Sequence, residues 1–163
     1  MQHQMIQSIV STEPTEKYMD IALDNLTQVM GGKKVFPSPP LNENELAQYI
    51  RKGLPVSVID SIMEAFNLTS EDLVIPLGVS ISTIKRRHKQ TQLSPSVSDR
   101  LFRVASIVSE ATEILGSQEK AARWLHKPNR ALGGDSPLSR LDTSIGFQQV
   151  EEVLLRIEYG IFS

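Results

Sequence analysis

The chain has few side chains that could hold a metal or act as a nucleophile, because it contains three histidines and no cysteine. His3, His88 and His126 lie in unrelated contexts, and no His-Glu-x-x-His pair is present. The sequence contains neither a Gly-x-Ser-x-Gly elbow nor a phosphate loop of the form Gly-x-x-x-x-Gly-Lys-Ser/Thr. We therefore predict a protein that is not an enzyme, with no catalytic residue, no cofactor and no metal site.

The charges that could bind a polyanion are concentrated in one short segment. Residues 1–79 hold 5 Lys or Arg against 10 Asp or Glu, whereas residues 80–103 hold 6 against 1. Residues 104–163 hold 6 against 8, and the net charge of the whole chain is −2. A chain with this balance does not coat nucleic acid along its whole surface, so any contact with DNA must come from the basic island at 80–103.

Residues 70–88, which overlap this island, fit the helix-turn-helix pattern. Apolar Leu73 and Leu77 precede Gly78, which permits a tight turn, and apolar Ile84 follows in the second helix. The first residues of that second helix could reach base edges while its cations neutralise phosphates. We expect the following residues to bind DNA: Ser80, Ser82, Thr83, Lys85, Arg86, Arg87 and Lys89.

Two residues depart from the usual helix-turn-helix pattern. Val74 stands where a small alanine is usual, and Pro76 lies inside the first helix. Proline there removes one backbone hydrogen bond and should distort the turn. A basic helix that is solvated and contacts nothing remains the alternative interpretation.

The elements that must position these residues are all expected to be helices. Apolar residues recur at three- and four-residue spacing, and no alternating strand pattern appears, which predicts an all-α fold. Capping residues, prolines and glycines at the ends place helices at about 16–30, 42–50, 55–66, 70–77, 81–90, 95–115, 118–125 and 144–159.

We predict three parts in the chain. Residues 1–40 form an N-terminal arm with one helix, and the proline-rich stretch at 35–40 is expected to be an extended linker that separates this arm from the body. A helix-turn-helix domain at 41–92 and a C-terminal helical module at 93–163 follow. No apolar run approaches the ~18 residues that span a bilayer, and the N-terminus lacks the pattern of a secretory signal. We therefore expect a cytoplasmic protein.

The C-terminal module contains three elements in order: Trp124-Leu-x-x-Pro-Asn129, Gly133-Gly-x-Ser-Pro137 and Arg156-Ile-Glu-Tyr-Gly160. Together they resemble the toxin-binding domain of the Xre/ParS-type antitoxins of type II toxin–antitoxin systems. The resemblance covers about residues 46–163, because an Xre-like helix-turn-helix domain also precedes the small helical toxin-binding domain in that family. The first 40 residues have no clear counterpart.

The resemblance implies a cognate RES-domain toxin as partner, an enzyme that acts on NAD and drains the cellular pool. It also implies that the antitoxin covers the toxin's active site with its own C-terminal end, and represses its own operon by binding operator DNA. The residues agree with this, since Gly160 should end the last helix and release an aromatic and an aliphatic side chain with a free carboxylate. The expected toxin-binding residues are Arg156, Glu158, Tyr159, Gly160, Ile161, Phe162 and Ser163.

Two alternatives stay open. The C-terminal end could fray and fold back onto the protein's own core. The whole chain could instead be a stand-alone helix-turn-helix regulator whose C-terminal module mediates self-association. A homodimer is expected in either case, because helix-turn-helix proteins generally read paired half-sites.

Overall fold

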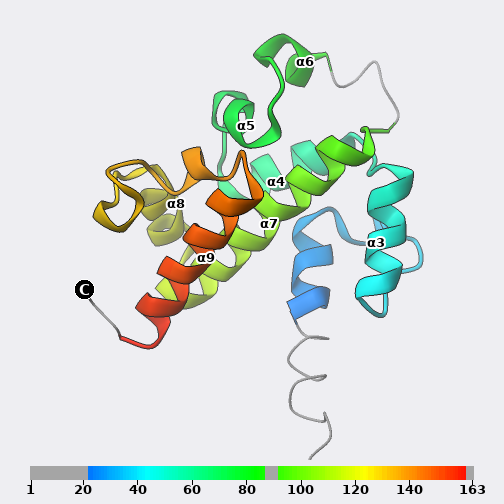
Figure 1. Ribbon diagram of the computed structural model, residues 1–163. Coiled ribbons are helices and arrows are strands. Elements are labelled where there is room, and N and C mark those ends of the chain that lie inside the picture. The colour runs from blue at the N-terminus through cyan, green and yellow to red at the C-terminus, as the bar shows by residue number, and fades with distance from the viewer. Residues whose placement is uncertain (1–21, 87–91, 161–163) are drawn as a thin grey trace, which may run out of the picture.

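The computed structural model describes residues 22–86 and 92–160, and its regular elements in these ranges are all helical (Figure 1). The prediction of an all-α fold is confirmed. A helix at 22–29 comes first. The remaining α-helices are α3 (Glu43–Lys52), α4 (Ser57–Phe66), α5 (Ser70–Leu77), α6 (Ile81–Lys85), α7 (Pro95–Leu115), α8 (Gln118–His126) and α9 (Ser144–Glu158). Short 3-10 turns are η1 (Gly32–Lys34), η3 (Arg130–Leu132) and η4 (Leu138–Arg140).

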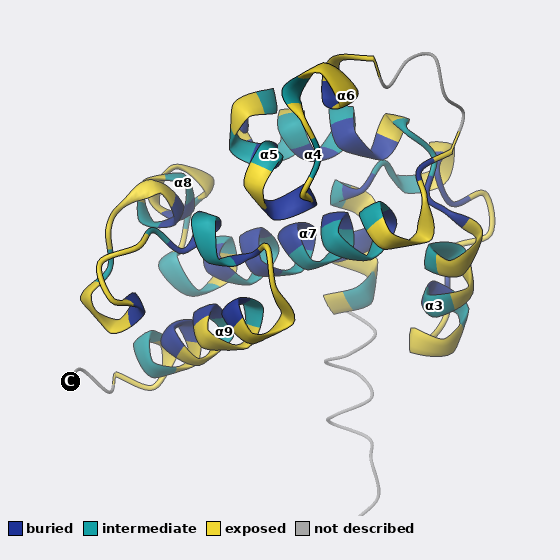
Figure 2. Ribbon diagram, turned by 45° about the horizontal axis from the view of Figure 1, so that its top comes forward, coloured by how far each residue is buried: buried dark blue, intermediate teal, exposed yellow. Residues whose placement is uncertain are grey.

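Helix α7 is the element on which the others assemble, since α3, α4, α5, α8 and α9 all contact it. Its 21 residues correspond to a length of about 31 Å. The Ser94 hydroxyl accepts the Val97 N–H at 3.2 Å, and Pro95 occupies the first turn, where its missing N–H costs little. A buried stripe runs along its length (Figure 2) and comprises Ser98, Leu101, Val104, Ala105, Ile107, Val108 and Ala111.

The start of α7 is tied to the connection between α3 and α4 by buried hydrogen bonds. The Leu54 N–H donates to the fully buried Ser98 hydroxyl at 2.8 Å, and the Leu93 N–H donates to the Leu54 carbonyl at 2.8 Å. A buried polar side chain is costly unless it is paired, so this contact fixes the depth at which α7 enters the core.

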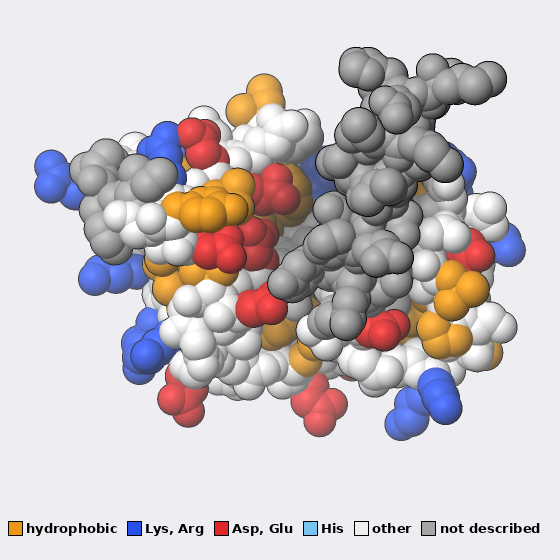
Figure 3. All heavy atoms as spheres, turned by 90° about the horizontal axis from the view of Figure 1, so that it is seen from below, with side chains coloured by type: hydrophobic (Ala, Val, Ile, Leu, Met, Phe, Trp, Pro, Cys, Tyr) orange, Lys and Arg blue, Asp and Glu red, His pale blue; other side chains and the backbone are white. Residues whose placement is uncertain are grey.

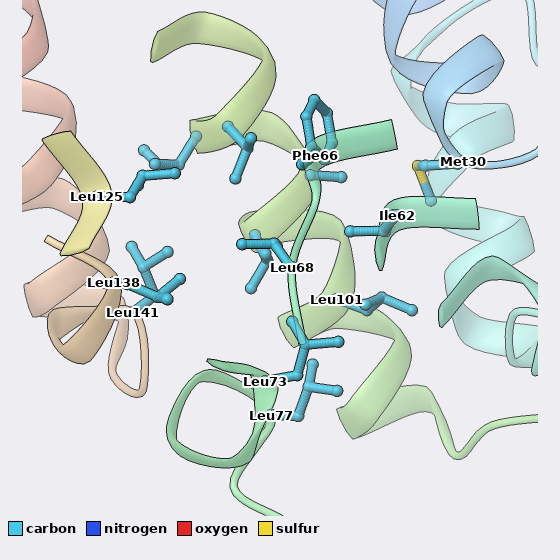
Figure 4. Packing of buried hydrophobic residues seen from close by; sticks show 14 of the residues in the cluster. Met30, Ile62, Phe66, Leu68, Leu73, Leu77, Leu101, Leu125, Leu138 and Leu141 are labelled. Carbon is cyan, nitrogen blue, oxygen red and sulfur yellow. The ribbon is translucent and has the colours of Figure 1, made fainter. Parts of the chain in front are cut away.

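One hydrophobic core joins the two halves of the chain. Leu68 and Leu73, beside and within the first helix of the helix-turn-helix, belong to the same cluster as Leu125, Leu138 and Leu141 from the C-terminal module (Figure 4). Helix α5 also contacts η4 directly. The two predicted functional parts are therefore packed against each other.

The proline-rich stretch at 35–40 does not separate an arm from the body. Val35 and Phe36 are buried in the common core, and the Phe36 ring meets the edge of Tyr49 with 5.0 Å between ring centroids. The Tyr49 hydroxyl also donates to the Ser38 carbonyl at 2.7 Å. The prediction of a spacer is wrong here because proline prevents a helix without preventing the two apolar residues before it from being buried.

The part of the first predicted helix before residue 22 lies outside the described residues. Within 22–86 and 92–160, no helix combines the length and apolar character needed to cross a membrane.

Candidate functional sites

The first helix of the helix-turn-helix begins with a capping box. The Thr69 hydroxyl accepts the Asp72 N–H at 3.3 Å, and the Asp72 carboxylate accepts the Thr69 N–H at 2.8 Å. Helix α5 then runs through the buried Pro76 and ends at Leu77. The proline removes the hydrogen bond that an N–H at position 76 would donate to the Asp72 carbonyl, but the helix continues to Leu77 and ends at the Gly78 cap.

The turn between the two helices depends on Gly78. This residue adopts φ +63°, and its N–H donates to the Val74 and Ile75 carbonyls at 3.0 and 3.1 Å. Left-handed backbone of this kind favours glycine. The Arg100 guanidinium, from α7, packs directly against Gly78, so one cation of the basic island covers the turn.

The second helix is shorter than predicted. Helix α6 spans only Ile81–Lys85, with Arg86 as its C-cap, whereas the sequence predicted a helix to about residue 90. Three of its five residues are β-branched, which lowers helix propensity. The remainder of the predicted helix, with Arg87 and Lys89, lies outside the described residues.

The other predicted DNA-binding residues come together on an exposed surface of α6. Ser80, Ser82, Thr83, Lys85 and Arg86 are all exposed. The Ser80 hydroxyl is the helix cap and accepts the Thr83 N–H at 3.2 Å, with the Ser82 and Thr83 hydroxyls each 2.9 Å away. Ser80 therefore has a structural role as the helix cap, and its contact with DNA stays a prediction.

In the C-terminal module, α9 is held close to η4 by a glycine. The Thr143 hydroxyl caps α9 by accepting the Gly146 N–H at 2.9 Å. Gly146 is buried, and a Cβ at this position would lie 1.8 Å from the Arg140 carbonyl oxygen. Only a residue without a side chain permits this approach.

Arg140 fastens the loop before α9. Its guanidinium donates to the Asp135 carboxylate at 2.9 Å, to the Leu132 carbonyl at 2.7 Å and to the Gln149 side-chain oxygen at 3.1 Å. The sequence could not distinguish a structural from a partner-contacting role for this arginine. These three hydrogen bonds show that it orders the loop and joins it to α9.

The last turn of α9 brings together the described members of the predicted toxin-binding set. Tyr159 is 73% exposed, and Arg156 pairs with Glu152 one turn earlier at 2.6 Å. Leu155, also exposed at 43%, lies one turn before Tyr159 on the same face, and sequence reasoning did not single it out. The feature of the sequence that could have identified Leu155 is its position outside the apolar stripe that α9 buries. Gly160 follows at φ +67°, and Ile161, Phe162 and Ser163 lie outside the described residues.

One polar contact links the two halves across 54 residues of sequence. The His126 ring at the end of α8 bonds through Nε2 to the Asp72 carboxylate at 2.8 Å and through Nδ1 to the Ala122 carbonyl at 2.7 Å. The backbone bond to Ala122 raises the pKa of His126, partial burial opposes this, and Asp72 raises it further. Burial acts to raise the pKa of Asp72, but hydrogen bonds from Thr69 and His126 outweigh burial and hold it below its usual value.

The two surfaces lie at opposite ends of the molecule. In Figure 1, α6 is at the top and the end of α9 is at the lower left, with α7 and the core between them. One protein could therefore bind a partner at each end at the same time.

Comparison with known families gives the class of protein. The antitoxin Xre-like helix-turn-helix domain matches residues 45–106, and the antitoxin Xre/MbcA/ParS C-terminal toxin-binding domain matches residues 110–160. A helix-turn-helix joined to a toxin-binding domain defines an antitoxin of a toxin–antitoxin system.

Individual relatives identify the family. The chain is 31% identical to the antitoxin Xre of Photorhabdus laumondii over 77% of this chain and 86% of that protein. It is 38% identical to the antitoxin Xre of Pseudomonas putida over 71% of this chain and 72% of that protein. The chain belongs to the Xre antitoxin family.

Two more distant similarities extend the comparison. The Prs ADP-ribosylating antitoxin of a Sphingobium species is 26% identical over 70% of this chain and 78% of that protein. A chain in the crystal structure of the M. tuberculosis MbcT–MbcA toxin–antitoxin complex shares the fold with a TM-score of 0.52 and 22% identity, over 66% of this chain and 96% of that chain.

Proposed function

We propose that this antitoxin neutralises a RES-domain, NAD-depleting toxin by placing its C-terminal end over the toxin's active site. The observation that carries the proposal is the exposed apolar surface at the end of α9, formed by Leu155 and Tyr159. Exposed aromatic side chains often anchor protein interfaces, because they bury a large area at a small cost in conformational entropy. Arg156 and Glu158 flank this surface and supply both signs of charge.

Two lines of support favour a toxin that acts on NAD. The Arg-Ile-Glu-Tyr-Gly element at 156–160 carries the resemblance to antitoxins that pair with such toxins. The name of the Sphingobium relative refers to ADP-ribosylation, for which NAD is the ordinary donor.

The test is deletion of residues 159–163, followed by co-expression with the toxin gene and measurement of growth and of cellular NAD. We expect protection to be lost while the thermal unfolding midpoint stays within about 2 °C of wild type, since Tyr159 and Gly160 are exposed. Ile145→Ala is the matched control, because Ile145 is an equally exposed apolar residue (69%) at the opposite end of α9. Full protection by the truncated protein would refute the proposed role of the C-terminal end.

We further propose that a homodimer represses its own operon in the cytoplasm through α6. The exposed Lys85 and Arg86, next to three exposed hydroxyl side chains, support this proposal. Replacing Arg86 by Ala should weaken operator binding and lower the slope of log affinity against log salt by about 1, as expected for the loss of one phosphate contact. Lys120→Ala, an exposed cation on α8, should leave both unchanged. An unaltered slope for the Arg86 variant would contradict the assignment.

A further inference from the structure

A groove of about 680 Å³ lies on the face shown in Figure 3, between the helix at 22–29, α3 and the α7–α9 pair. Its apolar lining comes from Leu23, Leu26, Leu41, Leu46 and Phe102. Leu41 is 76% exposed, the largest value among the exposed large hydrophobic residues of the described ranges. The described part of this face therefore presents apolar surface that no described element covers.

Carboxylates line the same groove. Glu110 and Glu113 come from α7 and Glu151 from α9. Burial raises the pKa of Glu110 to about 7, and the negative charges of Glu151, Glu158 and Glu113 add to the effect. Burial also raises the pKa of Glu151. In Figure 3 red carboxylates and orange hydrophobic side chains lie side by side on this face.

None of these carboxylates forms an ion pair with a described cation. The ion pairs in the described ranges use Asp99, Asp72, Asp135 and Glu152 instead. A half-buried carboxylate without a cation is destabilised in its charged form. A lysine or arginine supplied from outside would remove that cost, so the groove is complementary to a segment that carries both cations and apolar side chains.

The charge of the groove argues against two possible occupants. Residues 1–21 of this chain carry three acidic side chains and a single lysine, so their charge is the same as that of the groove. The basic island of a second copy is centred on α6, which lies at the far end of the molecule (Figure 1). Such head-to-tail contacts form rings or open chains rather than a two-fold symmetric dimer.

We propose that the groove binds a cationic amphipathic segment of the toxin, with a lysine or arginine between Glu110 and Glu151 and apolar side chains against Leu41 and Phe102. This inference rests on the proposed function, because it names a second contact of the same partner. The two proposed contacts lie near each other. Glu158, in the last turn of α9, is close enough for its negative charge to raise the pKa of Glu110 in the groove.

The test is a comparison of charge reversals in the full-length antitoxin. Affinity for a catalytically inactive toxin would be measured by calorimetry for Glu151→Lys and for Glu64→Lys, which makes the same change in charge at an exposed site on α4 outside this groove. We expect the first to weaken binding at least tenfold and the control to change it less than twofold. Leu41→Ser, which alters no charge, should weaken binding at least threefold. Circular dichroism melts would confirm that each variant is folded.

Several outcomes would overturn the inference. Equal toxin affinities for Glu151→Lys, Leu41→Ser and the Glu64→Lys control would show that the toxin does not bind the groove. The proposed function would still stand in that case if deletion of residues 159–163 abolishes protection. If Glu151→Lys or Leu41→Ser changes the oligomeric state of the free antitoxin but not its affinity for the toxin, the groove binds a second copy instead. Failure of the wild-type protein to bind the toxin would overturn both proposals.

Discussion

Replacing Glu110 by Gln should stabilise the free antitoxin at alkaline pH and leave its stability nearly unchanged in acid. Burial in the groove raises the pKa of Glu110 from 4.5 to about 7, so the folded protein holds a proton that the unfolded chain has already released between these pH values. The contribution of Glu110 to stability is fully present below pH 4.5 and is lost as the pH rises to about 7. Glutamine has no proton to lose, so the variant escapes this loss.

The magnitude follows from the width of that window. It spans about 2.5 pH units, and at about 1.4 kcal/mol per unit the unscreened effect would be about 3.5 kcal/mol. Glu110 is only half-buried, and solvent screening reduces the effect to an expected 1–2 kcal/mol, on the order of other partly exposed charge interactions. The gain should therefore be near zero at pH 4.5 and about 1–2 kcal/mol at pH 8.

The assay is urea unfolding of wild type, Glu110→Gln and Glu64→Gln at pH 4.5, 6 and 8, with the slope of free energy against urea compared across all three. Glu64 is an exposed carboxylate on α4 and should show the same pH dependence as wild type when replaced. The reasoning fails if Glu110→Gln gains no more stability between pH 4.5 and pH 8 than Glu64→Gln does.

Three further substitutions test other contacts. Gly146→Ala should destabilise the protein by about 2 kcal/mol or more, because the added Cβ would lie 1.8 Å from the Arg140 carbonyl oxygen; an unchanged thermal midpoint would contradict the close packing of α9 on η4. His126→Ala should lower the free energy of unfolding more at pH 5.5 than at pH 8.5. The pKa of His126 is raised in the folded protein, so its protonated ring stabilises the fold below the usual pKa of histidine, and this stabilisation is lost as the pH rises through the pKa in the folded state. Equal losses at the two pH values, measured by urea unfolding, would show that the contact with Asp72 does not depend on charge. Phe36→Ala should cost about 3–5 kcal/mol, as for other buried aromatic residues, and a loss below 1 kcal/mol would argue against its burial.

Helix boundaries were predictable wherever the signal is local. The Ser94-Pro95 start and Gly116 end of α7 are marked by a capping hydroxyl, a first-turn proline and a left-handed glycine, and the structure confirms both. The burial of Val35 and Phe36 was not predictable in this way. It depends on the helices they contact, and the neighbouring prolines indicated only that the backbone is neither helix nor central strand.

The candidate sites show the same division between local and tertiary signals. Arg156 and Glu158 lie in the last turn of α9 and Tyr159 and Gly160 follow directly, although their contact with a toxin stays a prediction. The acidic groove could not be found from sequence, since Glu110 and Glu151 lie 41 residues apart and look like ordinary solvated charges on two amphipathic helices. Only the packing of α9 against α7 places them together.

Helix α7 also has a consequence for how the protein unfolds. The two family matches, at 45–106 and 110–160, meet inside this single unbroken helix. Neither half can lose its structure without removing one side of the other half's core, so we expect a single cooperative transition with equal calorimetric and van't Hoff enthalpies. A single cut in either half would then remove the proposed contacts with toxin and operator together, because both depend on one folding equilibrium.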